Sequence, residues 1–459
     1  EVVTRRPAAA MGAQMSQPET AKDSDCAGPS GVLRLQWASS GMQGWRTNME
    51  DAHICLPSLQ AVANKVGTGG QGSALPWIEG WSDLALFGVL DGHGGEQVAK
   101  YSERHLPPVL CSFPVSVTTR GHNVDDIGAA LRESFHRIDD LLRDRGDSLP
   151  ELRKLSNRKA GATGGFPSQS QSVDPNNIGC TACICCITDQ RIICANAGDS
   201  RAVLCRSGKA VALSEDHKPN DDVERNRIQA AGGYIENSSG CWRVNGNLNL
   251  SRALGDLEYK KNTNLKPEEQ MICSTPDIHI EQRCSDDEFV VICCDGVWDR
   301  KTNQQVVDFV RARMPLDRGI EPEQMSGILE DLLDDCLSPN LQATSGLGGD
   351  NMTAVLIRFD QEPPRLRSVE TGPTSAQGGN LHAFVELPTG CCLNDLDVLI
   401  CEETAAIHVG MGNSAERKSK LISLQKHLPK GALPGFPPGS LAGQAQGRAK
   451  FSGKAGHLR

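Results

Sequence analysis

Three aspartates in this sequence each lie where an apolar run meets a short polar segment. They are Asp91, directly after Leu84–Leu90; Asp295, directly after Phe289–Cys294; and Asp350, which with Asn351 precedes Met352–Ile357. Runs of this length and β-branched content predict buried strands, so the three carboxylates are expected at strand ends. Hard divalent cations bind oxygen ligands, and a pair of them usually needs several carboxylates from different parts of the chain. The pattern therefore favours a divalent cation site.

An aspartate at the end of a strand also has a simpler structural interpretation. Aspartate followed by glycine, as at Asp91 and Asp295, is a common turn that requires no ligand. A turn does not, however, require His93 or the additional carboxylate pair Glu50 and Asp51. The joint occurrence of these residues favours the cation site over a set of unrelated turns.

Eight segments of the sequence follow, in order, the motifs of type 2C protein phosphatases. They are Arg46-Thr-Asn-Met-Glu50-Asp51, Asp91-Gly-His-Gly94, Gly179-Cys-Thr181-Ala, Asn196-Ala-Gly-Asp199-Ser-Arg201, Asp216-His-Lys-Pro219, Leu250-Ser-Arg-Ala-Leu-Gly-Asp256, Asp295-Gly-Val-Trp-Asp299 and Gly348-Gly-Asp350-Asn-Met-Thr353. The chain between Leu33 and Phe359 thus resembles this family of metal-dependent serine/threonine phosphatases. The resemblance implies an α+β fold in which two antiparallel β-sheets form a central sandwich flanked by α-helices. It also implies magnesium or manganese at one end of the sandwich.

The resemblance assigns roles to the residues expected to hold two metal ions. Asp91 resembles the carboxylate that bridges both ions, and Gly92 would offer its backbone carbonyl to one of them. Asp295 and Asp350 look like direct ligands of the other ion. These residues provide oxygen donors, as a hard cation requires.

Other positions match residues that surround these ligands in the family. Glu50 and Asp51 match positions that hold metal-bound waters. A third, more weakly bound metal ion is implied by a further group, namely Asp199, Asp295 and Asp299, with Thr181 nearby. Arg243 matches a position near the substrate-facing flap of the family, although a plain surface arginine fits the sequence equally well.

Physical chemistry and the resemblance lead to the same mechanism. A water molecule shared by two divalent ions loses its proton near neutral pH, and the resulting hydroxide can attack phosphorus without a protein nucleophile. Arg46 would hold the phosphate oxygens through its planar guanidinium, a geometry that lysine cannot reproduce. His93 is the candidate general acid for the leaving serine or threonine oxygen, its alternative being a hydrogen-bonded structural histidine. The expected function is hydrolysis of phosphoserine and phosphothreonine in proteins.

Two other functions stay open from the sequence. A catalytically silent phosphatase fold could serve as a scaffold, but a dead site usually loses at least one carboxylate and none is missing here. A hydrolase of small phosphate esters would keep the metal ions, but the sequence has no nucleotide-binding loop of the Gly-x-x-x-x-Gly-Lys type. Manganese-dependent turnover of a phosphopeptide would decide for the protein phosphatase.

The composition of the chain limits which partners it can bind and which cellular compartment suits it. The formal net charge of −10 argues against a nucleic-acid partner. Eighteen cysteines are spread along the chain, many of them in apolar runs such as Cys183–Cys186, which indicates buried thiols and a reducing cytosolic or nuclear compartment. Cys180-x-x-Cys183 has a zinc-like spacing, but no matching distant pair accompanies it.

Helices and strands must bring the candidate residues together. An apolar stripe at spacings of three and four predicts a helix over 127–142, and similar stripes follow Gly95 and Pro219, start at Gln304, and run from Met325 to Leu337. Further strands are predicted at 191–195 and 201–205. The strands group together rather than alternating strictly with helices, which favours packed sheets with helices outside.

The expected phosphatase domain covers residues 32–360, with surface insertions near 64–82 and 145–177. Residues 1–31 are expected to be a flexible leader, and 361–459 a low-order, basic tail. Met11-Gly12 begins a match to the N-myristoylation pattern, so, if translation starts at Met11, membrane association through a myristate on Gly12 stands beside a chance match. No apolar stretch is long enough to span a bilayer. We expect a monomer whose partners are phosphoprotein substrates.

Overall fold

The computed structural model describes residues 14–60, 62, 80–118, 121–156, 173–238, 240–315 and 319–359, together with two strands at 396–401 and 406–411. The chain divides into two compact units, Glu1–Pro363 and Pro364–Arg459. Among the described residues, no helix has the length and apolar character needed to cross a membrane.

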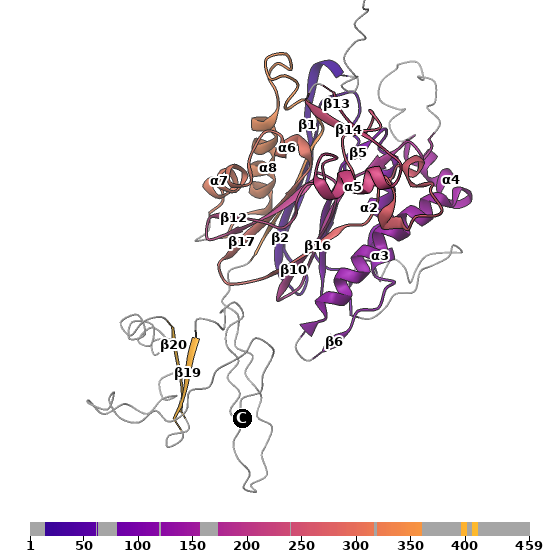
Figure 1. Ribbon diagram of the computed structural model, residues 1–459. Helices are drawn as coiled ribbons and strands as arrows, with labels where there is room; N and C mark the ends of the chain where they lie inside the picture. Colours follow the sequence, from indigo (N-terminus) through magenta and orange to yellow (C-terminus); the bar gives the residue numbers. More distant parts are fainter. Residues whose placement is uncertain are drawn as a thin grey trace, which may run out of the picture. The chain divides into compact units, whose positions relative to one another are not determined.

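Two antiparallel sheets lie face to face in the first unit (Figure 1). The six-stranded sheet has the order β1 (Gln14–Ser30), β2 (Leu35–Arg46), β18 (Met352–Arg358), β17 (Asp287–Cys293), β11 (Arg201–Arg206) and β12 (Lys209–Ala212). The five-stranded sheet has the order β16 (Asp277–Gln282), β10 (Arg191–Ala197), β9 (Ala182–Ile187), β4 (Ala85–Leu90) and β3 (Ala52–Leu56). The predicted sandwich of two antiparallel sheets is confirmed.

The central strands read as continuous apolar runs because both of their faces are buried. Along β17, Val290 and Ile292 point into the core between the sheets, whereas Val291 and Cys293 point to the layer of helices outside. Side chains on a strand alternate between its two faces, so a strand covered on both sides needs apolar residues at every position. The same reasoning explains why these runs could be recognised in the sequence.

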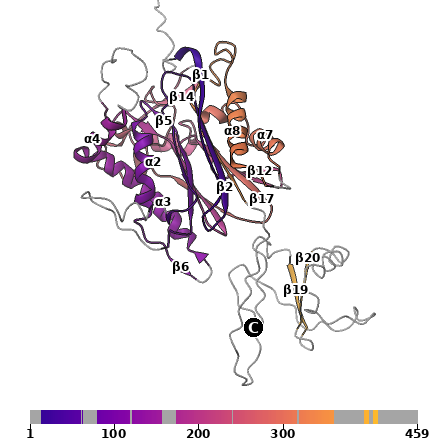
Figure 2. The same ribbon diagram turned by 180° about the vertical axis from the view of Figure 1, so that it is seen from behind.

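Helices cover the outer faces of the two sheets, as Figures 1 and 2 show from opposite sides. The five-stranded sheet is covered by α2 (Gln97–Leu110), α3 (Val124–Arg143) and α4 (Arg145–Ser156), and the six-stranded sheet by α7 (Asn303–Arg313) and α8 (Pro322–Cys336). The predicted stripe of α3 is fully buried, and Asn123 caps its first turn by accepting a hydrogen bond from the Asp125 amide. Thr302 and Gln305 form a capping box at the start of α7.

Shorter elements complete the first unit. They are β5 (Gly92–His93), β6 (Val117–Thr118), β7 (Gly121–His122), β8 (Gly179–Cys180), α5 (Asp222–Ala230), β13 (Ile235–Ser238), β14 (Cys241–Val244), β15 (Leu254–Gly255), two 3₁₀ turns η2 (Leu257–Lys260) and η3 (Pro267–Glu269), and α6 (Asp295–Trp298). Helix α5 and the hairpin β13–β14 share a small apolar core of their own, centred on Ile228, Val244 and Ile272.

The flexible leader predicted for residues 1–31 is wrong from residue 14 onward. Strand β1 pairs with β2 along its length, for example Asp23 with Gly41, and Ser24 donates a hydrogen bond to Glu330 of α8 at 2.8 Å. An edge strand with much exposed surface needs no alternating apolar pattern, because its backbone ladder supplies the pairing. The sequence therefore carried no periodic signal for it.

Regular structure also lies in one of the predicted surface insertions and in the predicted low-order tail. The first part of the insertion at 145–177 is helix α4, whereas residues 157–172, and most of the insertion near 64–82, lie outside the described residues. The tail at 361–459, predicted to be of low order, contains an antiparallel pair, β19 (Leu396–Cys401) and β20 (Ala406–Met411), in the second unit.

Candidate metal centre

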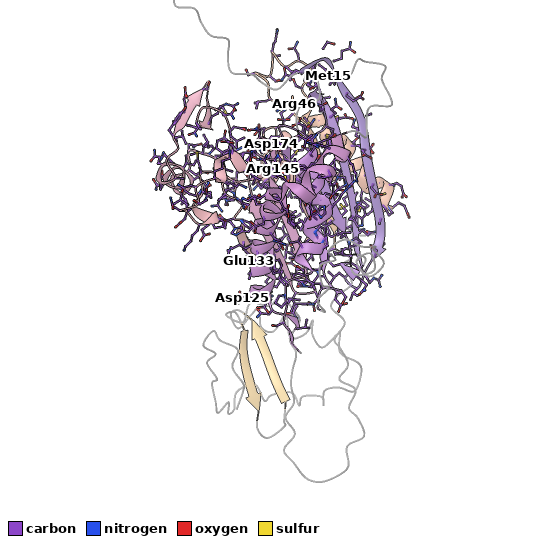
Figure 3. All side chains as sticks on the ribbon, turned by 90° about the vertical axis from the view of Figure 1, so that its right-hand side faces the viewer. Met15, Arg46, Asp125, Glu133, Arg145 and Asp174 are labelled. Carbon is purple, nitrogen blue, oxygen red and sulfur yellow. The ribbon has the colours of Figure 1, made fainter. Side chains whose placement is uncertain are left out.

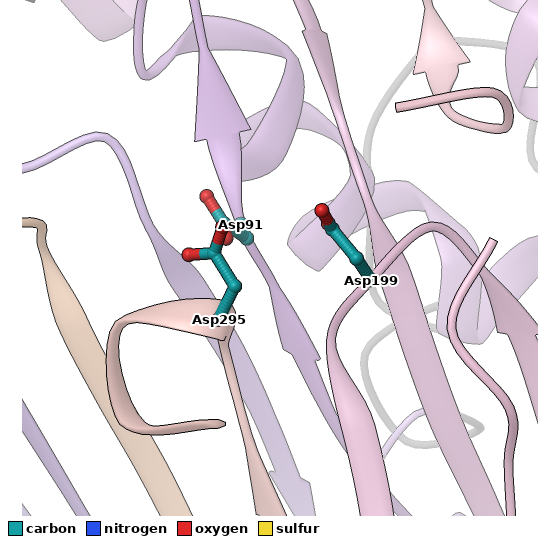
Figure 4. Close-up of side chains that lie close together, drawn as sticks. All are labelled: Asp91, Asp199 and Asp295. Atoms are coloured by element: carbon teal, nitrogen blue, oxygen red, sulfur yellow. The ribbon is translucent and has the colours of Figure 1, made fainter. Parts of the chain in front are cut away.

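Three aspartates from both sheets meet at one end of the sandwich. Asp91 follows the last residue of β4, Asp295 opens α6 just after β17, and Asp199 lies in the turn between β10 and β11. One carboxylate oxygen from each of the three lies within 4.8 Å of the others, and Figure 4 shows the side chains facing one another. We refer to Asp91, Asp199 and Asp295 as the acidic cluster. The expectation that Asp91 and Asp295 converge is met, and Asp199 joins them.

Close backbone packing holds the turns that carry the cluster. A Cβ atom at Gly92 would lie 2.2 Å from the carbonyl oxygen of Glu50, so only glycine lets the Glu50 segment approach Asp91 so closely. Gly198 has a φ of +125°, and a Cβ there would lie 2.5 Å from Cβ of Thr181. The Thr181 amide in turn donates to the carbonyl oxygen of Asp91 at 2.8 Å.

The cluster opens into a cavity of about 340 Å³, which we call the site cavity. Its polar lining includes most of the predicted site residues, namely Arg46, Glu50, Asp91, Gly92, His93, Thr181, Asp199, Asp295 and Asp350. Arg46 is the last residue of strand β2. Figure 3 shows it near Met15 and far from Asp125, which lies at the start of α3.

Burial and mutual repulsion make the ionised form of these carboxyls costly. Burial raises the pKa of Asp91 well above its ordinary value, and Asp51, Asp295, Asp350 and Asp199 raise it further. The pKa of Asp295 is raised for the same reasons, with Asp199 the strongest neighbour. Crowded, buried oxygen donors of this kind are stabilised as anions by a bound hard cation. The donors present therefore fit a divalent metal ion.

Arg46 and Asp350 form an ion pair at the cavity. Nη2 of Arg46 lies 2.5 Å from Oδ2 of Asp350, and both side chains are about one-third exposed, 35% and 36%. Burial acts to lower the pKa of Arg46, but Asp350, Asp295 and Asp91 together hold it above its ordinary value. Asp350 thus lies beside the acidic cluster, with one oxygen held by Arg46.

His93 is paired with an aspartate that lies far away in the sequence. Nε2 of His93 lies 2.6 Å from Oδ2 of Asp256, whose side chain is 3% exposed. Burial alone would lower the pKa of His93, but the charge and hydrogen bond of Asp256 raise it above its ordinary value. The imidazole is therefore held in one orientation at the edge of the cavity and favours its protonated form.

Glu50 and Asp51 lie at the end of the segment after β2, and of the two only Glu50 lines the site cavity. Thr353 donates to Oδ2 of Asp51 at 2.7 Å, while the buried Oδ1 has no hydrogen-bond partner. Burial, partly offset by the Thr353 hydrogen bond, raises the pKa of Asp51 to about 7. Asn351 fixes the segment by accepting from the Glu50 amide at 3.0 Å. An orphaned buried carboxylate oxygen is a position where a bound water or cation is expected.

Comparison with known proteins decides the family. The model of the family described as protein phosphatase 2C matches residues 36–344. The chain belongs to the protein phosphatase 2C family. The enzyme class expected from the sequence, a protein serine/threonine phosphatase, is confirmed, and the acidic cluster is consistent with the metal dependence of this family.

Relatives of this protein phosphatase 2C extend over most of its length. It is 36% identical over 389 residues to "Probable protein phosphatase 2C 11" of Oryza sativa subsp. japonica, covering 80% of this chain and 96% of the relative. It is 41% identical over 352 residues to "Protein phosphatase 2C homolog 2" of Schizosaccharomyces pombe, covering 76% of this chain and 79% of the relative.

A solved structure confirms the fold. The structure of serine-threonine phosphatase 2C from Toxoplasma gondii matches with a TM-score of 0.53 at 18% identity, covering 74% of this chain and 99% of that one.

Three predicted site residues of this phosphatase are absent from the lining of the site cavity. Asp51 lines a separate cavity together with Thr353. Asp299, at the end of α6, lines a neighbouring cavity, although burial and the charge of Asp199 raise its pKa. Arg243, in β14, donates to the carbonyl oxygen of Asn247 at 2.5 Å and is absent from the residues that line the site cavity. The described structure therefore brings none of these three side chains into the acidic cluster.

Several residues of the site received no role from the sequence. Lys218 donates to Oδ2 of Asp199 at 2.6 Å, and Asp256 and Asn351 hold His93 and the Glu50 segment as described above. All three residues lie inside the motifs given above. Their position in a motif was the feature of the sequence that could have identified them as site residues. Asn249 also lines the site cavity.

The zinc-like pair Cys180 and Cys183 has a structural explanation. Cys180 packs among the residues between the five-stranded sheet and its helices, whereas Cys183 faces the core between the two sheets. Cys180 in β8 and Cys183 in β9 therefore point into different apolar layers and are not placed to share one ion.

Proposed function

We propose that this protein phosphatase hydrolyses phosphoserine and phosphothreonine in proteins with two divalent cations, magnesium or manganese, bound at the acidic cluster. The observation that carries the proposal is the approach of Asp91, Asp199 and Asp295 within 4.8 Å at the floor of a cavity that Arg46 also lines. When bound, a pair of such cations supplies an acidified water molecule as nucleophile at neutral pH and neutralises the charge of the phosphate.

The residues of this chain divide the remaining work. Asp91, the carbonyl group of Gly92, Asp295 and Asp350 would hold the two cations, and Asp199 with Asp299 would support a third. Arg46 pairs with Asp350, which lies beside the acidic cluster. Its planar guanidinium can bind two phosphate oxygens, so it would bind and orient the substrate. Glu50 and the unpaired Oδ1 of Asp51 would accept hydrogen bonds from waters in the site.

His93 would donate the proton that the leaving oxygen of serine or threonine needs. Its pairing with Asp256 orients the ring and raises its pKa above its ordinary value, which favours the protonated form that a general acid needs. Proton transfer of this kind typically contributes about 10²- to 10⁴-fold in rate.

The test is turnover of a phosphoserine or phosphothreonine peptide by the full chain. We expect activity with manganese or magnesium that disappears on chelation, returns when the ion is restored, and falls at least about 10² in Asp295→Ala, as when a key electrostatic group is lost. Folded protein that turns over no phosphopeptide with saturating manganese would support a silent scaffold instead.

For localisation we propose the cytoplasm or nucleus, with membrane association if Gly12 is acylated. Residues 1–13 lie outside the described residues, and β1 begins at Gln14, two residues beyond Gly12. Mass spectrometry of the N-terminus of a chain expressed from Met11 beside an N-myristoyltransferase tests this. An N-terminus that stays unmodified would rule out the lipid.

A further inference from the structure

The ammonium group of Lys218 already lies at the Asp199 corner of the acidic cluster. Its Nζ donates to Oδ2 of Asp199 at 2.6 Å. Burial acts to lower the pKa of Lys218, but Asp199 and Asp295 hold it above its ordinary value, so the group is a cation. The same charge opposes the rise in pKa of Asp295 and Asp299. The positive charge of Lys218 thus stabilises the ionised carboxylates of Asp199, Asp295 and Asp299.

The backbone around Lys218 is tied to the turn that carries Asp199. The His217 amide donates to the carbonyl oxygen of Gly198 at 3.0 Å, and the Gly198 amide donates to Nδ1 of His217 at 3.2 Å. Asp221 accepts from the Lys218 amide at 2.9 Å. These hydrogen bonds fix the backbone of Lys218 beside the Asp199 turn. Its side chain can therefore reach the acidic cluster.

Lys218 and Asp199 differ in how freely each side chain can break their ion pair. The side chain of Lys218 is 35% exposed, whereas that of Asp199 is 3% exposed. A lysine stem has four rotatable carbons, so the ammonium can turn out to water while Asp199 stays at the cluster. The contact is therefore one that a competing cation can displace.

A divalent cation and the ammonium group compete for the same carboxylate. Magnesium binds carboxylate oxygens at about 2.0–2.1 Å and carries twice the charge of an ammonium, so the two cations repel each other strongly at neighbouring positions in a buried site. We propose that Lys218 is an internal counter-ion that competes with a divalent cation for Asp199 and thereby sets the cation concentration at which this corner of the site fills. The inference rests on the proposed binding of divalent cations by the cluster.

The competition has a consequence for the other cations. While Lys218 holds Asp199, the corner is neutralised without metal, and Asp91 and Asp295 can be filled first. Filling the Asp199 corner requires the ammonium to move to solvent, which weakens binding there relative to the rest of the cluster. Lys218 thus sets an order of filling.

The test measures manganese binding by calorimetry, with free manganese followed by electron paramagnetic resonance, on the wild-type chain, Lys218→Met and Lys218→Arg. We expect Lys218→Met to tighten the weakest manganese step at least tenfold, and Lys218→Arg to keep it within about threefold of wild type because the positive charge remains. Lys22→Met is the matched control, since Lys22 pairs with Asp334 outside the cavity and its loss changes net charge equally. It should leave all steps unchanged.

Unchanged or weaker manganese binding in Lys218→Met overturns the inference. So does a variant that raises KM for phosphopeptide with unaltered manganese binding, because Lys218 would then bind the substrate phosphate. If wild type itself binds no manganese, the proposed function fails instead, and the two failures are distinct.

A second measurement follows Lys218 directly in the wild-type chain. Lysine side-chain ammonium groups are followed by ¹⁵N nuclear magnetic resonance during a titration with diamagnetic magnesium, with Lys218→Arg serving to assign the signal. We expect the protected Lys218 signal to move to the position of an exposed lysine as the weakest site fills. A Lys218 signal that stays protected at saturating magnesium contradicts the competition.

Discussion

The guanidinium of Arg46 and the carboxylate of Asp350 form an ion pair at the site cavity, with Nη2 2.5 Å from Oδ2. Arg46 ends β2 and Asp350 precedes β18, two strands that pair side by side, so the sheet itself brings a candidate phosphate-binding side chain next to a candidate metal ligand. In the structure, Asp350 supplies the anion that Arg46 would meet in a phosphorylated substrate.

Arg46→Lys should lower kcat/KM for a phosphopeptide by about 10², because a lysine keeps the charge and loses the two-pronged contact with phosphate oxygens. Steady-state kinetics with saturating manganese measure the loss. Arg143→Lys, in the exposed pair with Asp140, is the control and should leave kcat/KM unaltered. Equal activity of Arg46→Lys and wild type would remove Arg46 from substrate binding.

Asp256→Asn should shift the pH dependence of turnover. Asp256 holds the pKa of His93 above its ordinary value, so its loss lowers that pKa, and the fall in activity with rising pH should begin at lower pH. The pair also stabilises the fold below the ordinary pKa of histidine, about 6.5, and that contribution is lost as pH rises through the raised value. Glu151→Gln, which breaks the remote pair with His105, should leave the profile in place, and an unmoved profile in Asp256→Asn would argue for a structural His93.

The metal-free protein should lose stability as pH rises. The pKa values of Asp91 and Asp295 are raised by burial first and by neighbouring carboxylates second, and that of Asp51 is raised to about 7. The folded state therefore binds more protons than the unfolded state above about pH 4, the ordinary value for aspartate, and deprotonation destabilises it.

Thermal unfolding with a chelator and with manganese at pH 5.5 and pH 8 checks this. With chelator, Tm should be lower at pH 8, and manganese at about 100 times its Kd should raise Tm there by about 5 °C. A smaller rise is expected at pH 5.5, where protons compete with the ion. A chelated protein that is more stable at pH 8 would contradict the crowding of ionised carboxylates.

Glu224→Gln should lower the free energy of unfolding by about 3 kcal/mol, because it removes one of the two carboxylates that pair with the buried Arg252 and leaves only Asp277, which is largely exposed. Burial alone would raise the pKa of Glu224, but Arg252 and Arg227 bring it down to about 2. Its stabilising contribution is therefore complete above about pH 4.5 and is lost as pH falls toward 2.

Denaturant unfolding between pH 3 and pH 7 measures both effects of Glu224. Asp222→Asn, in the exposed pair with Arg225 on the same helix, is the control and should cost less than about 1 kcal/mol. If both substitutions cost the same, the buried network around Glu224 does not anchor α5.

The sequence predicted the sandwich and the convergence of Asp91 and Asp295 because both depend on local patterns. Strands buried on both faces are apolar at nearly every residue, so each aspartate that ends such a run is visible in the chain. Strand β1 was missed because an exposed edge strand shows no such pattern. Helix α4 was missed for a related reason, since Pro150 and a weakly apolar face obscure it.

The pairings inside the site could not be read from the sequence. His93 and Asp256 are separated by 163 positions and Arg46 and Asp350 by 304, so their contacts exist only after the sheets have formed. Lys218 and Asp199 are closer, at 19 positions, yet their contact depends on the hydrogen bonds between His217 and Gly198. The sequence motifs indicate that these residues belong to the site, but they do not indicate which residue each one contacts.

Anomalous diffraction from crystals of the wild-type chain grown with manganese tests the central claim most directly. We expect two strong manganese peaks in the site cavity, with carboxylate oxygens of Asp91 and Asp295 at about 2.0–2.2 Å from the ions. A folded, manganese-saturated protein without anomalous density beside these aspartates would contradict the assignment of the acidic cluster as a metal centre.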